Sequence, residues 1–128
     1  MIDNFEPIHD EDLGSVKISD EVMAICAINA TLRTEGVAEL AGGVSDVIAE
    51  SILGKESLSK GVKVSQNEDG IIFDVYIIVE YGVKIPTVAW DIQSNVKNEV
   101  ETMTDREVLG VNIHVQGVEE ESEKNEKI

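Results

Sequence analysis

Apolar residues recur with helical spacing in two long segments of the chain. The first covers residues 20–33, where Ser19 is a suitable N-cap and Gly36 marks the end. The second begins near Pro86, since proline is tolerated in a first helical turn. Its predicted buried stripe consists of Val88, Ile92, Val96, Val100 and Met103. We therefore predict two main helices.

Strand patterns occur before and after the second helix. Residues 62–65 and 71–81 flank the turn sequence NEDG, and the longer segment alternates apolar with more polar residues. These features predict a β-hairpin. Residues 108–116 alternate in the same way, with Val111, Ile113 and Val115 on one face and Asn112, His114 and Gln116 on the other. They predict a last strand.

Three shorter segments complete the order of elements. Residues 14–18 and 37–41 are predicted to be short strands, and residues 44–53 a short helix. Helices separated by neighbouring strands favour a mixed or antiparallel sheet that is covered on one face. We therefore predict an α+β fold, a two-layer sandwich in which a small mixed or antiparallel sheet carries both main helices on one face.

The size and charge of the chain restrict its class. Its 128 residues fit one domain, and 42% hydrophobic but only 4% aromatic residues require a core of Val, Ile, Leu and Ala. The 26 acidic and 10 basic side chains give a net charge of −16. This charge argues against nucleic acid or a bare anionic membrane as a partner.

Acidic residues are concentrated at the two ends. Residues 1–12 carry five acids and no Lys or Arg, and residues 119–128 carry five acids and two lysines. We predict that both are flexible tails outside a single domain formed by residues 13–118. Association between these acidic subunits should depend on salt, because their mutual repulsion is screened over about 10 Å at 0.1 M ionic strength.

Targeting signals and cysteine content predict a cytoplasmic protein. The first residues are acidic where a signal peptide is basic, and the longest apolar run, residues 22–28, is far shorter than a membrane span. Cys26 is the only cysteine, so the chain forms no intrachain disulfide. We expect neither secretion nor direct membrane insertion.

The sequence contains no motif for enzymatic or metal chemistry. A phosphate loop, a dinucleotide fingerprint, a nucleophile elbow and a His-Glu-x-x-His helix are all absent. His9 precedes three carboxylates in an acidic tail, His114 has no recognisable acid–base partner, and Cys26 has no basic neighbour to activate it. We predict a protein that is not an enzyme and that has no catalytic residue, cofactor or metal ion.

Two apolar features lie outside the predicted core. The first helix is apolar around most of its circumference, and we expect Val22, Ile25 and Cys26 to cover the sheet. The residues left over, which we predict to form a partner or self-association surface, are Met23, Ala27, Ile28 and Trp90. Exposed apolar patches and tryptophans commonly mark protein contacts. An indole folded over the helix flank or the sheet edge is the alternative for Trp90.

Seven short motifs follow one another along the body of the chain. They are GSVKIS (14–19), EGVAELA (35–41), KGVKV (60–64), VEYG (79–82), IPTVA (85–89), IQSNVK (92–97) and VNIHVQG (111–117). As an ordered set they resemble the alkaline-shock-protein family of bacterial envelope stress-response proteins. One position departs from the family pattern, because relatives typically carry Gly-Leu where this chain has Asp105 and Arg106. Aspartate tolerates a left-handed helix cap less readily than glycine, so we expect the helix to end differently here.

The resemblance implies a small, non-enzymatic cytoplasmic protein, mostly of Gram-positive bacteria. Such a protein acts through protein partners in cell-envelope homeostasis, and some members are held near the membrane by an anchored partner. A homo-oligomer is compatible with this role. Other relatives are associated with acetyl-CoA carboxylase, so the alternative is a regulator of lipid biosynthesis at that enzyme. A third class, an enzyme, would require a pocket where an acid and a histidine converge.

Overall fold

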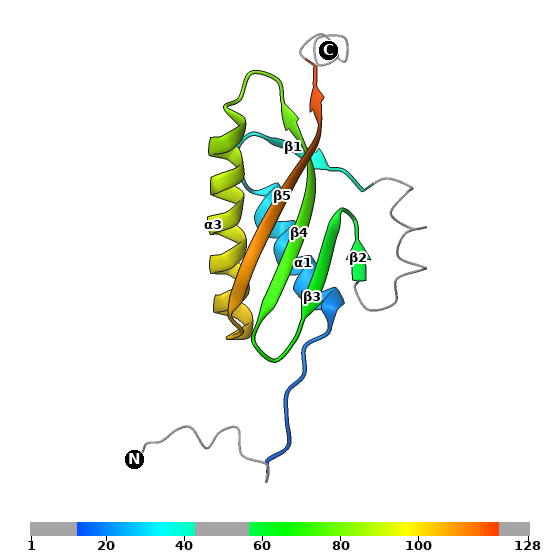
Figure 1. Cartoon of the computed structure of the whole chain (residues 1–128), viewed down its shortest axis with the longest axis vertical. Coiled ribbons are helices and arrows are strands. Elements are labelled where there is room, and N and C mark those ends of the chain that lie inside the picture. The colour runs from blue at the N-terminus through cyan, green and yellow to red at the C-terminus, as the bar shows by residue number, and fades with distance from the viewer. Residues whose placement is uncertain (1–12, 43–56, 121–128) are drawn as a thin grey trace.

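The computed structural model describes residues 13–42 and 57–120, which form two helices and five strands (Figure 1). In chain order they are α1 (Asp20–Leu32), β1 (Val37–Leu40), β2 (Ser57–Ser59), β3 (Val62–Gln66), β4 (Ile71–Glu80), α3 (Ile85–Thr104) and β5 (Val108–Glu119). The helix predicted at 44–53 and nearly all of the two predicted tails lie outside the described residues.

Strand β4 is the centre of a mixed sheet. Along one edge it pairs in parallel with β5 over its full length, from Ile71 opposite Val108 to Glu80 opposite Glu119. The other edge is shared by two antiparallel strands, since β3 pairs with the first half of β4 and β1 with the second half. β2 pairs with the outer edge of β3. The β3–β4 hairpin and the strand β1 confirm their predictions.

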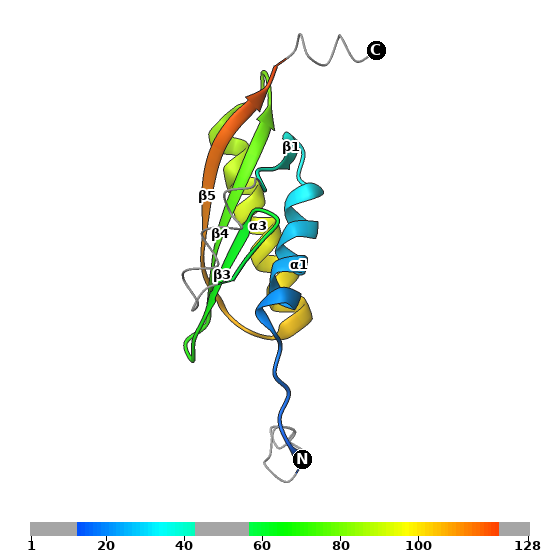
Figure 2. The ribbon, with the colours of Figure 1, turned by 90° about the vertical axis from the view of Figure 1, so that its right-hand side faces the viewer.

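Both helices cover the same face of this sheet, as the side view shows (Figure 2). The residues of β4 alternate accordingly between a buried inner face and a half-buried outer face. The inner residues of β4 are Ile71, Phe73, Val75, Ile77 and Val79. Val62 and Val64 of β3 and the stripe Val88, Ile92, Val96 and Val100 of α3 complete most of the core. The predicted two-layer α+β sandwich is thereby confirmed.

The helix ends follow local capping chemistry. The hydroxyl of Ser19 accepts a hydrogen bond from the Val22 N–H at 3.2 Å, as its prediction as N-cap requires. The C-cap of α1 is Arg33 with a φ of −84°, so the predicted left-handed cap at Gly36 is wrong. Gly36 lies in the turn before β1 with a φ of +99°, and a Cβ atom there would lie 2.6 Å from Cγ2 of Val88, so only glycine fits. At the end of α3, Asp105 adopts the left-handed conformation with φ +62°. The expected difference at this end is therefore wrong, because aspartate takes the conformation that glycine would.

Other details differ from the sequence-based expectation. The strand predicted at residues 14–18 is not formed. The Ile18 carbonyl accepts a hydrogen bond from the side chain of Gln66 in β3, and not from a backbone N–H of that strand. β2 was not predicted. β5 continues to Glu119 because it follows β4 to its end, with register shifts near each of its own ends. Met103 is exposed and does not belong to the buried stripe of α3.

Candidate functional site

Helix α1 contacts the sheet mainly through small side chains. Its buried residues are Met23, Ala24, Cys26, Ala27, Ala30 and Thr31. Alanine lets the backbone of a helix approach closely to whatever lies beneath it, and α1 contacts β1, β2 and β3 of the sheet and the neighbouring helix α3. The bulkier branched side chains of α1 are therefore turned toward solvent.

This arrangement reverses the face that we predicted for α1. Met23 and Ala27 are fully buried and Ile28 is partly buried against the core, so these residues do not form an exposed surface. In contrast, Val22 and Ile25 are 45% and 55% exposed. The predicted orientation is wrong because a helix that is apolar on all sides carries no periodicity to select its inner face. The face that α1 buries carries mainly small side chains, together with Met23.

Four exposed apolar side chains of the helical layer form a surface that we call the α1 patch. It consists of Val22, Ile25 and Leu32 on α1 and Met103 on α3. The thiol of Cys26 donates to Sδ of Met103 at 3.7 Å, so Met103 lies beside the turn of α1 that carries Ile25. Exposed apolar residues that gather in this way, unlike isolated ones, are typical of contact surfaces.

Polar contacts between the helices fix the orientation of α1. Arg33 donates to a Glu99 carboxylate oxygen at 2.6 Å, and the Asn95 amide donates to the Thr34 hydroxyl at 2.9 Å.

Burial raises the pKa of the Cys26 thiol, and the negative charge of Glu99 raises this pKa further. Cys26 is therefore a buried, unreactive thiol, as we predicted.

A second apolar surface lies where the sheet extends past the first turn of α3. Here a groove of about 610 Å³ is lined by Val79, Glu80, Tyr81, Gly82, Val83, Ile85, Val118 and Glu120. We call it the end groove. Its large side chains Tyr81, Ile85 and Val118 are exposed. The groove is open and shallow at the end of the molecule that carries the β4–α3 loop, at the top of Figure 1.

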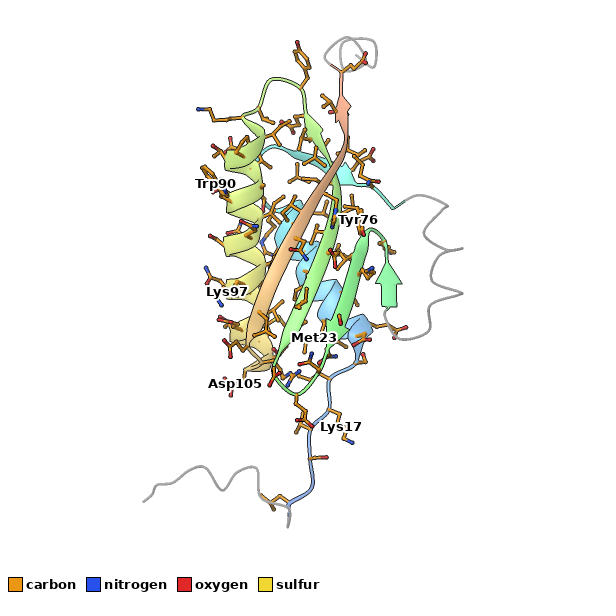
Figure 3. The ribbon with its side chains drawn as sticks, in the orientation of Figure 1. Lys17, Met23, Tyr76, Trp90, Lys97 and Asp105 are labelled. Carbon is orange, nitrogen blue, oxygen red and sulfur yellow. The ribbon has the colours of Figure 1, made fainter. Side chains whose placement is uncertain are left out.

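Trp90 lies on α3 near this end of the molecule. Its side chain is 63% exposed and points away from the sheet (Figure 3). The predicted outward orientation is confirmed, whereas its role in a contact stays a prediction. Trp90 and the α1 patch therefore belong to different parts of the helical layer.

The outer face of the sheet brings an acid and a histidine together. Nε2 of His114 donates to an Asp74 carboxylate oxygen at 2.8 Å, and the imidazole stacks on Tyr76 with ring centroids 4.4 Å apart. Asn112 donates to the same oxygen at 3.2 Å. We did not predict a partner for His114, because the pairing requires the parallel register of β4 and β5. A hydrolytic pair needs a shielded cleft, yet this pair lies on the open face of the sheet, where the imidazole is 40% exposed.

The described ranges 13–42 and 57–120 contain no cluster of three or more His, Cys, Asp or Glu that could hold a metal ion. Within the same ranges, neither helix has the length and apolar character needed to cross a bilayer. Three apolar surfaces on these residues bear on function: the α1 patch, the end groove and Trp90. They are exposed apolar features of a small α+β domain.

Comparison with known proteins gives the family. Over residues 8–120 the chain matches the family of alkaline-shock protein 23, which is described as having a cell envelope-related function. It therefore belongs to that family, and the resemblance to alkaline-shock proteins is confirmed. It is 38% identical to YqhY of Bacillus subtilis over 117 residues, which cover 91% of this chain and 86% of that protein. It is also 42% identical to YloU of the same organism over 107 residues, or 82% of this chain and 88% of YloU.

A more distant relative has a descriptive name. A stress response regulator gls24 homolog of Streptococcus pyogenes is 29% identical over 102 residues, which cover 80% of this chain and 57% of that protein. The family description and the names of these relatives indicate no enzymatic activity. Among solved structures, the MamM-CTD H285A structure matches with a TM-score of 0.49 at 15% identity, covering 79% of this chain and all of that one.

Proposed function

We propose that this protein is a non-enzymatic scaffold of the bacterial cell-envelope stress response, acting in the cytoplasm and recruited to the membrane by an anchored protein partner. The observation that carries the proposal is the end groove, with Tyr81, Ile85 and Val118 exposed around an open apolar floor. Membership of a family with a cell envelope-related function supports the setting. The name of the streptococcal relative supports the link to stress.

The chemistry of the end groove restricts its partner. Its apolar lining of Val79, Val83 and the exposed Val118 takes aliphatic or aromatic side chains, while Glu80 and Glu120 contribute carboxylates. A chain with a net charge of −16 attracts basic segments. The partner segment that fits is therefore a peptide with a few apolar side chains flanked by Lys or Arg. Membrane proteins carry such basic residues in the cytoplasmic segments next to their spans.

Co-purification from cells tests this proposal. The tagged protein is cross-linked in its own bacterium during envelope stress, as wild type, as the double variant Tyr81→Ala/Val118→Ala and as Leu109→Ala. Leu109 is a matched control, since it is an exposed apolar residue outside the end groove. We expect a membrane-associated protein to be enriched with wild type and with Leu109→Ala, and to fall at least about tenfold with the groove variant.

Two results would contradict the proposal. The first is that no membrane-associated or envelope-linked protein is enriched over an untagged control. The second is equal enrichment with wild type and the groove variant, which would remove the end groove from the contact. Enrichment of acetyl-CoA carboxylase subunits in place of a membrane protein would support the alternative role, regulation of lipid biosynthesis. A carboxylase gene beside the gene for this protein would favour the same alternative, and a membrane-anchor gene the scaffold.

A further inference from the structure

The α1 patch forms a stripe along the side of α1 that faces away from the sheet. Val22, Ile25, Asn29 and Leu32 follow each other at intervals of three or four residues, so they lie on one helical face. Three of the four are large apolar residues that are about half exposed. Met103 widens the stripe on the side of α3. A helix with a single buried face does not need this apolar surface for its own packing.

The stripe is symmetric about the middle of the helix. Val22 and Leu32 lie equally far on either side of position 27, and so do Ile25 and Asn29. We propose that α1 packs antiparallel against α1 of a second copy of the chain through the α1 patch, about a two-fold axis at the level of Ala27. A two-fold contact uses the same surface on both subunits, and this symmetry makes the α1 patch complementary to itself.

Charges at the two ends of α1 determine the direction of this packing. Glu21 and Arg33 flank the stripe at equal distances from position 27, and both are exposed. Antiparallel packing brings Glu21 close to the partner's Arg33 at each end, whereas parallel packing would bring like charges together. The helix dipoles favour the same antiparallel arrangement. Arg33 already donates to Glu99 within its own chain, but its guanidinium is 61% exposed and has further N–H donors for a second carboxylate.

The overall charge of the protein opposes this contact and makes it dependent on salt. Two chains that each carry −16 repel one another, and 0.5 M salt screens this repulsion to within a few ångströms. The apolar part of the contact is not weakened by salt. We therefore expect a dimer that is tighter at high than at low ionic strength. A partner segment from another protein, or residues 43–56 of the same chain, would give no such dimer.

Sedimentation of the purified full-length protein at about 1 to 100 µM tests the contact. Wild type should shift with concentration from 14.0 kDa toward twice that mass. Ile25→Glu should weaken the dimer at least about tenfold. Leu109→Glu, which adds the same charge at another exposed apolar residue, should weaken it less than about threefold. A monomer at all concentrations in 0.5 M salt, or equal loss with both variants, would overturn the proposal.

A charge reversal tests the antiparallel direction. At low salt, Glu21→Arg alone and Arg33→Glu alone should each weaken the dimer several-fold, because each places like charges together at both ends of the contact. The double variant Glu21→Arg/Arg33→Glu should restore the affinity to within about threefold of wild type. Glu99→Gln removes the ion pair with Arg33 inside the chain and should leave the dimer intact. Failure of the double variant to restore the dimer would overturn the antiparallel arrangement.

These experiments use only the purified chain, so they do not depend on the proposed function. A dimer without an envelope-linked partner would leave this inference standing and contradict the proposed function. A monomer that still captures such a partner through the end groove would do the reverse.

Discussion

The two helices of this domain differ in how their sequences encode the side that is buried. α3 is amphipathic, and the residues Val88, Ile92, Val96 and Val100 all lie against the sheet. α1 is apolar on nearly every side, with small residues buried and Val22, Ile25 and Leu32 exposed. In α3 the hydrophobic period therefore selects the inner face, whereas the face that α1 buries carries mainly small side chains, together with Met23.

The comparison also separates a packing role from a binding role. A buried stripe with polar residues opposite leaves only scattered apolar residues for a partner to contact, on α3 Ile85, Trp90 and Met103. An apolar helix that buries its alanines leaves several large apolar side chains on its other side, here Val22, Ile25 and Leu32.

Val96→Asp and Trp90→Ala compare the inner and outer sides of α3. Val96 is fully buried, so an aspartate there would bury an unpaired charge, and we expect the domain to unfold. Trp90→Ala should change the free energy of unfolding by no more than about 1 kcal/mol, because the indole is mostly exposed. If Trp90 is a hot spot, the same change should weaken partner binding by more than about 1 kcal/mol.

Thermal unfolding and partner binding per folded molecule distinguish these outcomes. Suppose that Trp90→Ala lowers thermal stability as severely as Val96→Asp and leaves binding unchanged. Trp90 would then be a core residue, and the predicted contact would be wrong.

Ala27→Leu and Ile25→Ala make the same comparison on α1. Ala27 is fully buried at the close approach to the sheet, so the larger side chain should lower the free energy of unfolding by about 1–3 kcal/mol, although it adds apolar surface. Ile25→Ala should lower it by less than about 1 kcal/mol, since the isoleucine is 55% exposed. Urea unfolding at a fixed low protein concentration measures both. A larger loss for Ile25→Ala than for Ala27→Leu would contradict the orientation of α1.

Two buried threonines at the end of α1 predict effects of opposite sign. Among the described residues, the Thr31 hydroxyl is buried without a hydrogen-bond partner, so Thr31→Val should stabilise the fold by about 1 kcal/mol. The Thr34 hydroxyl donates to the Ala30 carbonyl and accepts from the Asn95 amide, both at 2.9 Å. Thr34→Val should therefore destabilise by about 1–2 kcal/mol. Calorimetry of the two variants measures the difference, and the same sign for both would contradict this assignment.

The smallest predicted effect is a pH dependence at the end of α3. Two hydrogen bonds lower the pKa of the Glu101 carboxyl below its ordinary value, the larger effect coming from the Val108 N–H and the smaller from the Lys97 ammonium. A group with a lowered folded-state pKa stabilises the fold above its unfolded pKa, and this contribution is lost as the pH falls through the folded pKa. Glu101→Gln should therefore cost stability at pH 7 and progressively less below about pH 4. Urea unfolding of wild type and Glu101→Gln at pH 7 and below about pH 4 measures this difference in stability. A cost of the substitution that does not change with pH would contradict the prediction.

Much of the fold follows from local patterns in the sequence. The α3 stripe apart from Met103, the NEDG hairpin and the Ser19 N-cap each depend on residues close together in the chain, and each is found where it was predicted. β2 is only three residues long and has no periodicity to detect. The pairing of β4 with β1, on the edge that it also shares with β3, and with β5 on the other edge depends on contacts between distant residues, which no local pattern encodes.

The surfaces were less predictable than the fold. Trp90 could be placed because it interrupts a clear period on α3, whereas Met23, Ala27 and Ile28 of α1 could not. The three alanines Ala24, Ala27 and Ala30, each three residues after the last, were the feature of the sequence that indicated the buried side of α1. Contact between Asp74 and His114 needs the parallel β4–β5 register, which becomes visible only in three dimensions.

The rate of thiol labelling distinguishes the buried from the exposed face of α1. In a Cys26→Ala background, single cysteines are placed at Ile25 and at Ala27, and each variant is labelled with a thiol reagent at about 1 µM protein. We expect Ile25→Cys to react within about tenfold of the unfolded chain and Ala27→Cys to be protected at least about 100-fold. Protection of Ile25→Cys should then rise with protein concentration as the proposed dimer forms. Faster labelling at position 27 than at position 25 would contradict the account.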